Sequence, residues 1–169
     1  MDEHLGFLPV EITTPLQLRR VRETLCSVSE FYPEFATWFD RKVCSGVETG
    51  SRKVFACLNQ DIFLGIAIAK RSNQERKLST LWVSPHARTQ RIALQLANSA
   101  FLWMETKRPT FTVPEERIGE FRGLLRTWHF TQVMTAKDLY RKEKLEYVFN
   151  SSCTPQRPLE HSLDSTSKF

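Results

Sequence analysis

Three apolar runs in the middle of the chain constrain the fold more than any other feature. They cover Lys53–Leu58, Ile62–Lys70 and Lys77–Val83, and short polar stretches built on NQD and RSNQE separate them. Runs of this length, bounded by polar turns, are typical of strands. Strands joined by such short turns pair in the antiparallel direction, because a parallel pair needs a crossover of about a dozen residues or more. The sequence therefore predicts an antiparallel three-stranded meander.

Helical periods flank this meander on both sides. Before it, a short strand at Phe7–Ile12 precedes a helix that Thr14 caps and Pro15 begins, and a second helix covers about residues 33–43. The stretch CSGVETGS that follows is predicted to be a turn-rich connector. After the meander, Ile92 opens a helix of about 14 residues, whose apolar stripe recurs with the helical period.

The last third of the chain adds one more helix and three strands. A strand at Thr110–Val113 precedes a helix at Pro114–Trp128, and the runs FTQVMTA and LEYVFN close the pattern as strands. The order βααβββαβαββ predicts an α+β fold, with a mixed, mostly antiparallel sheet flanked by helices. Residues 1–150 are expected to form one domain. Residues 151–169 are rich in Ser, Thr and Pro and are expected to be a disordered tail.

Composition narrows the class of protein. The 169 residues are 41% apolar, enough for a core without staples, and no apolar stretch approaches the roughly 20 residues of a membrane span. The four cysteines are scattered without a CxxC pair, which argues against a disulfide framework and against a zinc site. We therefore expect a soluble, cytoplasmic protein that does not bind a membrane.

The positive charge is concentrated in the middle of the chain. Residues 51–108 carry 10 basic and 3 acidic groups, whereas residues 1–50 carry 5 basic and 8 acidic groups. A field of this sign attracts phosphates and other anions, although a solvated basic face explains charge alone equally well. Within this segment the strand ending LWVSP leads through HARTQR directly into the helix that begins at Ile92. A helix N-terminus offers free N–H groups and a partial positive charge, so this junction is predicted to bind a phosphate-bearing ligand.

The same junction resembles motif A of the GCN5-related N-acetyltransferases, whose loop reads Gln/Arg-x-x-Gly-x-Gly/Ala. The matching stretch is Arg88-Thr89-Gln90-Arg91-Ile92-Ala93, in which Arg91 replaces the central glycine. The element order from Phe7 to Asn150 is similar to that family's fold as well. Two further departures occur in the helix VPEERIGEFRGLLRTWHF, where His129 replaces the glycine of a Gly-Phe pair and Leu125 stands where the family has a tyrosine acid.

The resemblance implies acetyl-CoA as the acetyl donor. Its pantetheine arm would pair with the main chain of Leu81, Trp82 and Val83, and its pyrophosphate would lie against residues Arg88 to Ala93, namely Arg88, Thr89, Gln90, Arg91, Ile92 and Ala93. Acetyl transfer to an amine also needs a base and an acid. The resemblance favours Glu75 as the base, with a solvated turn carboxylate as the alternative. With the family's tyrosine absent, Tyr140 or Tyr147 could supply the acid, and Tyr140 is favoured because it precedes the basic turn RKEK.

Three functions stay open from the sequence. The first is an N-acetyltransferase that acts on the primary amine of a small molecule, a peptide or an aminoacyl-tRNA. The second is a non-catalytic protein of the same fold that binds acyl-CoA or acts as an interaction module, which the replaced glycines and tyrosine favour. The third is a nucleic-acid surface, for which the sequence supplies the basic charge and no RNA-binding motif. Neither the acceptor nor the oligomeric state follows from the sequence.

Overall fold

The computed structural model describes residues 7–88 and 91–151. Its strands form two antiparallel sheets, in the orders β1-β2-β3-β4 and β5-β7-β6. The predicted meander is confirmed as β2, β3 and β4, and the predicted mixed α+β order holds along the described chain. The first sheet consists of β1 (Val10–Ile12), β2 (Arg52–Asn59), β3 (Ile62–Arg71) and β4 (Arg76–Val83), and the second of β5 (Phe111–Pro114), β6 (Gln132–Lys137) and β7 (Leu145–Phe149).

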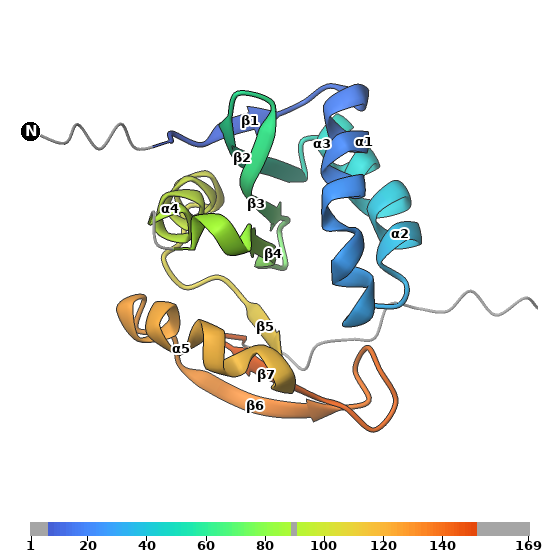
Figure 1. Cartoon of the computed structure of the whole chain (residues 1–169). Helices are drawn as coiled ribbons and strands as arrows, with labels where there is room; N and C mark the ends of the chain where they lie inside the picture. The colour runs from blue at the N-terminus through green and yellow to red at the C-terminus, as the bar shows by residue number, and fades with distance from the viewer. Residues whose placement is uncertain (1–6, 89–90, 152–169) are drawn as a thin grey trace, which may run out of the picture.

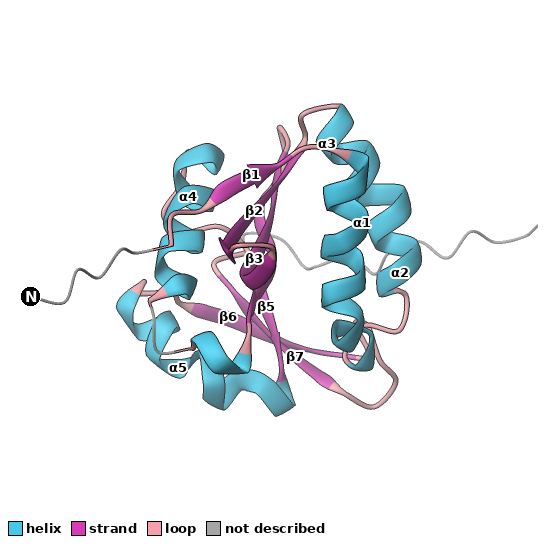
Figure 2. Ribbon diagram, turned by 45° about the horizontal axis from the view of Figure 1, so that its top comes forward, coloured by secondary structure: helices cyan, strands magenta, loops and turns pink. Residues whose placement is uncertain are grey.

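Helices cover both faces of the strands. Helix α1 (Pro15–Thr24), the 3₁₀ segment η1 (Leu25–Glu30), and the run α2 (Phe35–Trp38), η2 (Phe39–Cys44) and α3 (Ser45–Glu48) lie on one face. Helices α4 (Ile92–Met104) and α5 (Ile118–Thr127) lie on the other, as Figure 1 and Figure 2 show. The short 3₁₀ turns η3 (Pro85–Ala87) and η4 (Glu115–Arg117) precede these two helices.

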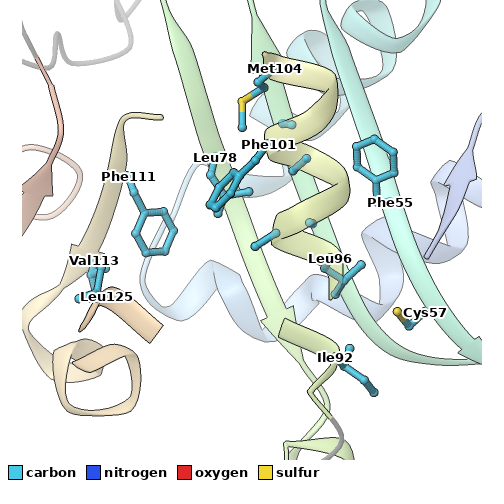
Figure 3. Packing of buried hydrophobic residues seen from close by; sticks show 14 of the residues in the cluster. Phe55, Cys57, Leu78, Ile92, Leu96, Phe101, Met104, Phe111, Val113 and Leu125 are labelled. Atoms are coloured by element: carbon cyan, nitrogen blue, oxygen red, sulfur yellow. The ribbon is translucent and has the colours of Figure 1, made fainter. Parts of the chain in front are cut away.

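Two hydrophobic clusters fill the spaces between the layers. One lies under α1–α3 and includes Phe39 and Ile66, both fully buried. The other lies under α4, where Leu96 and Met104 are fully buried against the first sheet, and it continues to Phe111 of the second sheet (Figure 3). Because this second cluster spans both sheets, α4 is fixed relative to β4 and to β5.

Local signals fixed several element ends as predicted. Thr14 caps α1 through a capping box with Gln17, and Pro15 occupies the first turn. In contrast, residues 45–48 of the stretch predicted as a connector form α3. Gly46 lies within this helix, and a Cβ at this position would lie 2.6 Å from Cδ of Arg52. The glycine serves close packing, so the turn-rich composition on which the connector prediction depended does not end the helical segment here.

Other boundaries differ by a few residues. The first strand begins at Val10 rather than Phe7, and Pro114 belongs to β5 while the helix proper starts only at Ile118. The last strand ends before Asn150, whose φ of 56° is left-handed and stops the extended conformation. The predicted tail beyond Ser151 lies outside the described residues. No helix among the described residues is long and apolar enough to cross a membrane.

Candidate active site

Strands β4 and β5 run side by side only at their beginning. The N–H of Leu78 donates to the carbonyl of Thr110 at 3.0 Å, and the N–H of Thr110 donates to the carbonyl of Arg76 at 2.8 Å. Lys77 and Thr110 form a single parallel bridge there, and beyond it the two strands belong to different sheets. The later part of β4 therefore presents a strand edge that β5 does not cover.

A β-bulge lies where the strands separate. Ala69 of β3 pairs with Leu78 and Ile68 pairs with Thr80, which leaves Ser79 as the extra residue of β4. A bulge bends its strand and increases the local twist. Here it turns the second half of β4 away from β5 and re-aims the backbone groups after Ser79.

A cleft of about 70 Å³ occupies the gap between the strands. Its walls come from η1, β4, β5 and the start of the last helical segment, and the lining residues are Val28, Phe31, Tyr32, Ser79, Thr80, Leu81, Trp82, Phe111, Thr112, Pro114, Arg117 and Phe121. A second hollow, at α1 and the β2–β3 turn, is wider and lies open on the surface. Its Arg20 is already bonded to the carbonyl of Asp61, so we place the chemistry in the β4–β5 cleft.

The predicted cofactor residues begin at the β4 wall of the cleft and continue along the chain to the first turn of α4. Leu81 and Trp82 form its β4 wall, and Val83 ends the strand. Arg88 is exposed and its Nη1 lies 3.3 Å from Oε2 of Glu120, which links the loop to α5. Arg91 is the N-cap of α4. The side chain of Ile92 is buried in the core, so only its main chain is available to a ligand, and Ala93 follows in the first turn. Thr89 and Gln90 lie outside the described residues.

Both residues that replace family glycines adopt left-handed backbone conformations. Arg91 has φ 55° and His129 has φ 53°, a region that a glycine enters without steric cost. A glycine would therefore suit both positions. Leu125, at the position of the family's tyrosine, is buried in the core and offers no polar group.

The two predicted catalytic residues lie in different surroundings. Glu75 precedes β4 at the end remote from the basic loop, and its Oε2 is paired with Nζ of Lys70 at 2.7 Å. It is not among the residues that line the cleft. Tyr140, in the β6–β7 loop, packs edge-on against the cleft residue Tyr32 with ring centroids 5.0 Å apart. Its hydroxyl accepts a hydrogen bond of 3.2 Å from Nζ of Lys77.

The sequence argument missed Glu146, a buried carboxylate next to this tyrosine pair. Glu146 lies on β7 and is 2% exposed, and neither of its oxygens has a hydrogen-bond partner of good geometry among the described residues. Burial raises its pKa to about 7, with Glu116 adding to the shift while Arg141, Lys77 and the hydroxyl of Tyr32 oppose it. The alternation of LEYVF held a signal, because Glu146 shares its strand face with the buried Val148.

The cations around Glu146 are largely engaged elsewhere. Arg141 makes a two-pronged pair with Glu116, at 3.0 Å and 2.7 Å, and this pair lowers the pKa of Glu116 to about 2. Burial raises the pKa of Tyr32 well above its ordinary value, and the nearby carboxylate of Glu146 adds to the effect. Tyr32 is therefore a protonated phenol near neutral pH. No cluster of side chains suited to a metal ion occurs in the described parts of the chain.

Substituting Glu146 by Gln should make the protein more stable at alkaline pH. The folded pKa of about 7 exceeds the ordinary value of 4.5, so the folded state retains a proton that the unfolded chain releases. The stability contributed by this proton is fully present below about pH 4.5 and is lost as pH rises through 7, a loss on the order of 3 kcal/mol. Glu146→Gln stays neutral and avoids that loss. Urea unfolding at pH 5 and pH 8 should show its advantage over wild type growing with pH.

The exposed Glu143, three residues earlier, provides the control for that measurement. Glu143→Gln makes the same chemical change outside the core, and its effect on the free energy of unfolding should not depend on pH. An advantage of Glu146→Gln that is equal at both pH values would contradict the assignment of a raised pKa to Glu146.

Comparisons with known proteins reveal the fold alone. No family profile matches the sequence, and no curated protein matches it either. Among solved structures, a GNAT-family protein from Desulfovibrio desulfuricans is 15% identical with a TM-score of 0.66, covering 83% of this chain and 95% of its own. An aminoglycoside 6′-N-acetyltransferase complexed with coenzyme A is 12% identical with a TM-score of 0.60, covering 84% and 94%.

A third similar structure contains the acetylated cofactor. It is a GNAT-family acetyltransferase from Elizabethkingia anophelis with acetyl-CoA bound, 11% identical, with a TM-score of 0.56 and coverage of 86% of this chain and 97% of its own. These three likenesses each cover between 83% and 86% of this chain. The chain therefore has the fold of the GCN5-related N-acetyltransferases.

Proposed function

We propose that the protein is an acetyl-CoA-dependent N-acetyltransferase that acts on a primary amine. The observation that carries the proposal is the open edge of β4, which leads from the β4–β5 cleft into a basic loop and the N-terminus of α4. Structures of the same fold include complexes with coenzyme A and with acetyl-CoA. We infer that the acetyl donor lies along this edge.

The residues present suit such a ligand. Leu81–Val83 pair with β3 on one side, and their main-chain groups on the other side can pair with the amides of a pantetheine arm as an added strand would. The free N–H groups at the start of α4, with the guanidinium groups of Arg88 and Arg91, complement a pyrophosphate. The apolar side chains of Leu81, Trp82 and Phe111 give the acetyl end a largely water-poor wall.

The chemistry requires few groups from the protein. A neutral amine attacks the thioester carbonyl, and charge develops on the carbonyl oxygen in the transition state. Main-chain N–H groups released from pairing at the bulge of β4 are suited to stabilise that charge. The acceptor enters from the side of η1, where Phe31 and Tyr32 line the cleft.

We infer a small amine-bearing molecule as the acceptor. Proteins of the same fold include an aminoglycoside 6′-N-acetyltransferase and a nourseothricin acetyltransferase. Peptides and aminoacyl-tRNA are further acceptors to include in any screen. The alternative function is a non-catalytic acyl-CoA sensor, which the burial of Leu125 at the position of the family's tyrosine favours.

A thiol-release assay tests the proposal. Wild-type protein and acetyl-CoA are mixed with one amine at a time, and free thiol is followed with a thiol-reactive dye. The amines are kanamycin, nourseothricin, spermidine, a short peptide with a free N-terminus and an aminoacyl-tRNA. Release of coenzyme A with at least one amine, accompanied by the N-acetylated product in a mass spectrum, is expected. Binding of acetyl-CoA without transfer to any amine would favour the sensor, and absence of binding would reject both functions.

A further inference from the structure

We propose that Glu146 and Tyr32 are the proton-transfer pair of the cleft, Glu146 as the base for the acceptor amine and Tyr32 as the acid for the departing thiolate. This inference rests on the proposed acetyl transfer. It assigns the base to β7 and the acid to the loop just after η1, two segments far apart in the sequence.

The register places Glu146 on the face of the second sheet that bounds the cleft. Glu146 lies opposite Pro114 of β5, and two residues along the same pair Val148 lies opposite Thr112. Directly opposed residues of an antiparallel pair project from the same face of the sheet. Thr112 and Pro114 both line the cleft, as does Tyr32, so Glu146 lies on the cleft side of the second sheet, next to these lining residues along the strand pair.

The burial of the Glu146 carboxyl group and its lack of hydrogen-bond partners indicate a role other than packing. A carboxyl group that is 2% exposed and without a well-formed hydrogen bond carries a large desolvation cost, and ordinary core positions avoid such groups. Its charged neighbours are Arg141, Lys77 and Glu116. Arg141 is held by Glu116, and Lys77 is directed to the hydroxyl and ring of Tyr140.

Glu146 can therefore gain and lose a proton near neutral pH. Burial without a dedicated cation raises its pKa to about 7, which suits a base that must accept a proton and then release it. Tyr32 has a pKa raised well above its usual value by burial, so its phenol keeps its proton near neutral pH. The carboxylate of Glu146 adds to the raised pKa of Tyr32, and the hydroxyl of Tyr32 lowers the pKa of Glu146, so each group affects the ionisation of the other.

Glu146 and Tyr32 together account for each proton transfer that follows the formation of the neutral amine. The acceptor ammonium first loses one proton to solvent, and the neutral amine nitrogen forms its bond to the acetyl carbonyl carbon. The nitrogen, now positively charged, gives its second proton to the carboxylate of Glu146. The C–S bond breaks, the thiolate takes the proton of the Tyr32 hydroxyl, and Glu146 returns its proton to the tyrosine. The amide and a free thiol leave, and both protein groups are restored.

The kinetics of four variants test the pair. The acceptor is an amine that the wild type acetylates, and the binding of acetyl-CoA to each variant is measured separately by calorimetry. For Glu146→Gln we expect kcat to fall about 10²- to 10⁴-fold with the Kd of acetyl-CoA within about threefold of wild type. The acid limb of kcat/KM with its midpoint near 7 should disappear, leaving only the ionisation of the amine itself. Tyr32→Phe should lower kcat at least about tenfold and keep that limb.

Two neighbouring carboxylates serve as matched controls. Glu143→Gln, at an exposed loop position, should retain the wild-type profile. Glu116→Gln should keep substantial kcat and move the acid limb to lower pH, because it removes a nearby negative charge and frees Arg141 to favour the ionised form of Glu146. A merely structural role for Glu146 would not move the limb in this way.

The outcomes separate this inference from the proposed function. If acetyl-CoA binds, the wild type is active, and Glu146→Gln retains kcat within about threefold with an unchanged acid limb, the pair is rejected while the function stands. If acetyl-CoA binds but no amine of the panel is acetylated, the pair is rejected in favour of a sensor. If acetyl-CoA does not bind, the proposed function fails, and the pair fails with it.

Discussion

Replacing both Arg88 and Arg91 by Glu is expected to weaken acetyl-CoA binding about a hundredfold or more. Both residues flank the junction between β4 and α4, and each can offer a guanidinium to a phosphate oxygen. A hydrogen bond to a charged group contributes roughly 1.5–3 kcal/mol, and about 1.4 kcal/mol corresponds to a factor of ten in Kd. Arg88 and Arg91 are both exposed, so solvent and salt weaken their hydrogen bonds, and we use about 1.5 kcal/mol for each. Calorimetric titration measures the change.

The ligand itself provides the sharpest control for this pair. S-acetylpantetheine lacks the phosphates, so its affinity should be the same for the double variant and the wild type. The double variant Arg122→Glu/Arg126→Glu makes the same change in net charge on the exposed part of α5, and it should lower acetyl-CoA affinity much less. Equal losses for acetyl-CoA and for S-acetylpantetheine would contradict a phosphate role for Arg88 and Arg91.

Replacing Gly65 by Ala should destabilise the folded protein by about 1–3 kcal/mol. Gly65 lies on β3 beneath the first turns of α4, and a Cβ there would meet Cγ2 of Ile92 at 2.5 Å and Cδ1 of Leu96 at 2.8 Å. Both side chains are fully buried in the cluster of Figure 3, so neither has space to yield. Urea unfolding followed by circular dichroism measures the change in free energy.

Gly123 gives the matched substitution for that experiment. It lies inside α5, and a Cβ there would meet nothing within 4 Å. Gly123→Ala should therefore stabilise the protein by about 0.5–1 kcal/mol, since alanine favours helix interiors over glycine. A Gly65→Ala protein as stable as wild type would show that α4 is not held against β3 in the way the contacts indicate.

Periodicity in the sequence predicted the order of the elements because each element buries one face. Apolar runs bounded by polar turns identified β2, β3 and β4, and the apolar stripe from Ile92 identified α4. Periodicity failed where packing overruled local preference. Gly46 belongs to the stretch predicted as a connector, yet it lies in α3, where the side chain of Arg52 occupies the space that a Cβ would need.

The candidate site could be predicted only in part. The cofactor residues proposed from the sequence form one continuous segment, Leu81 to Ala93, so a local motif was enough to propose them. Glu146 and Tyr32 come from opposite ends of the chain, and their approach depends on how β7 and η1 meet around the cleft. No local feature of the stretch LEYVF predicts that its carboxylate, Glu146, lies near a tyrosine. Glu75 drew attention through its place near β4, yet the structure pairs it with Lys70.

Amide hydrogen exchange with and without acetyl-CoA tests the central claim, that the donor binds along the open edge of β4, most directly. The predicted result is slower exchange of the amides of Leu81–Val83 and of the first turn of α4, with little change at the opposite edge strand β1. If saturating acetyl-CoA leaves the exchange of these amides unchanged, or slows exchange only in β1 or α1, the donor does not bind along the edge of β4.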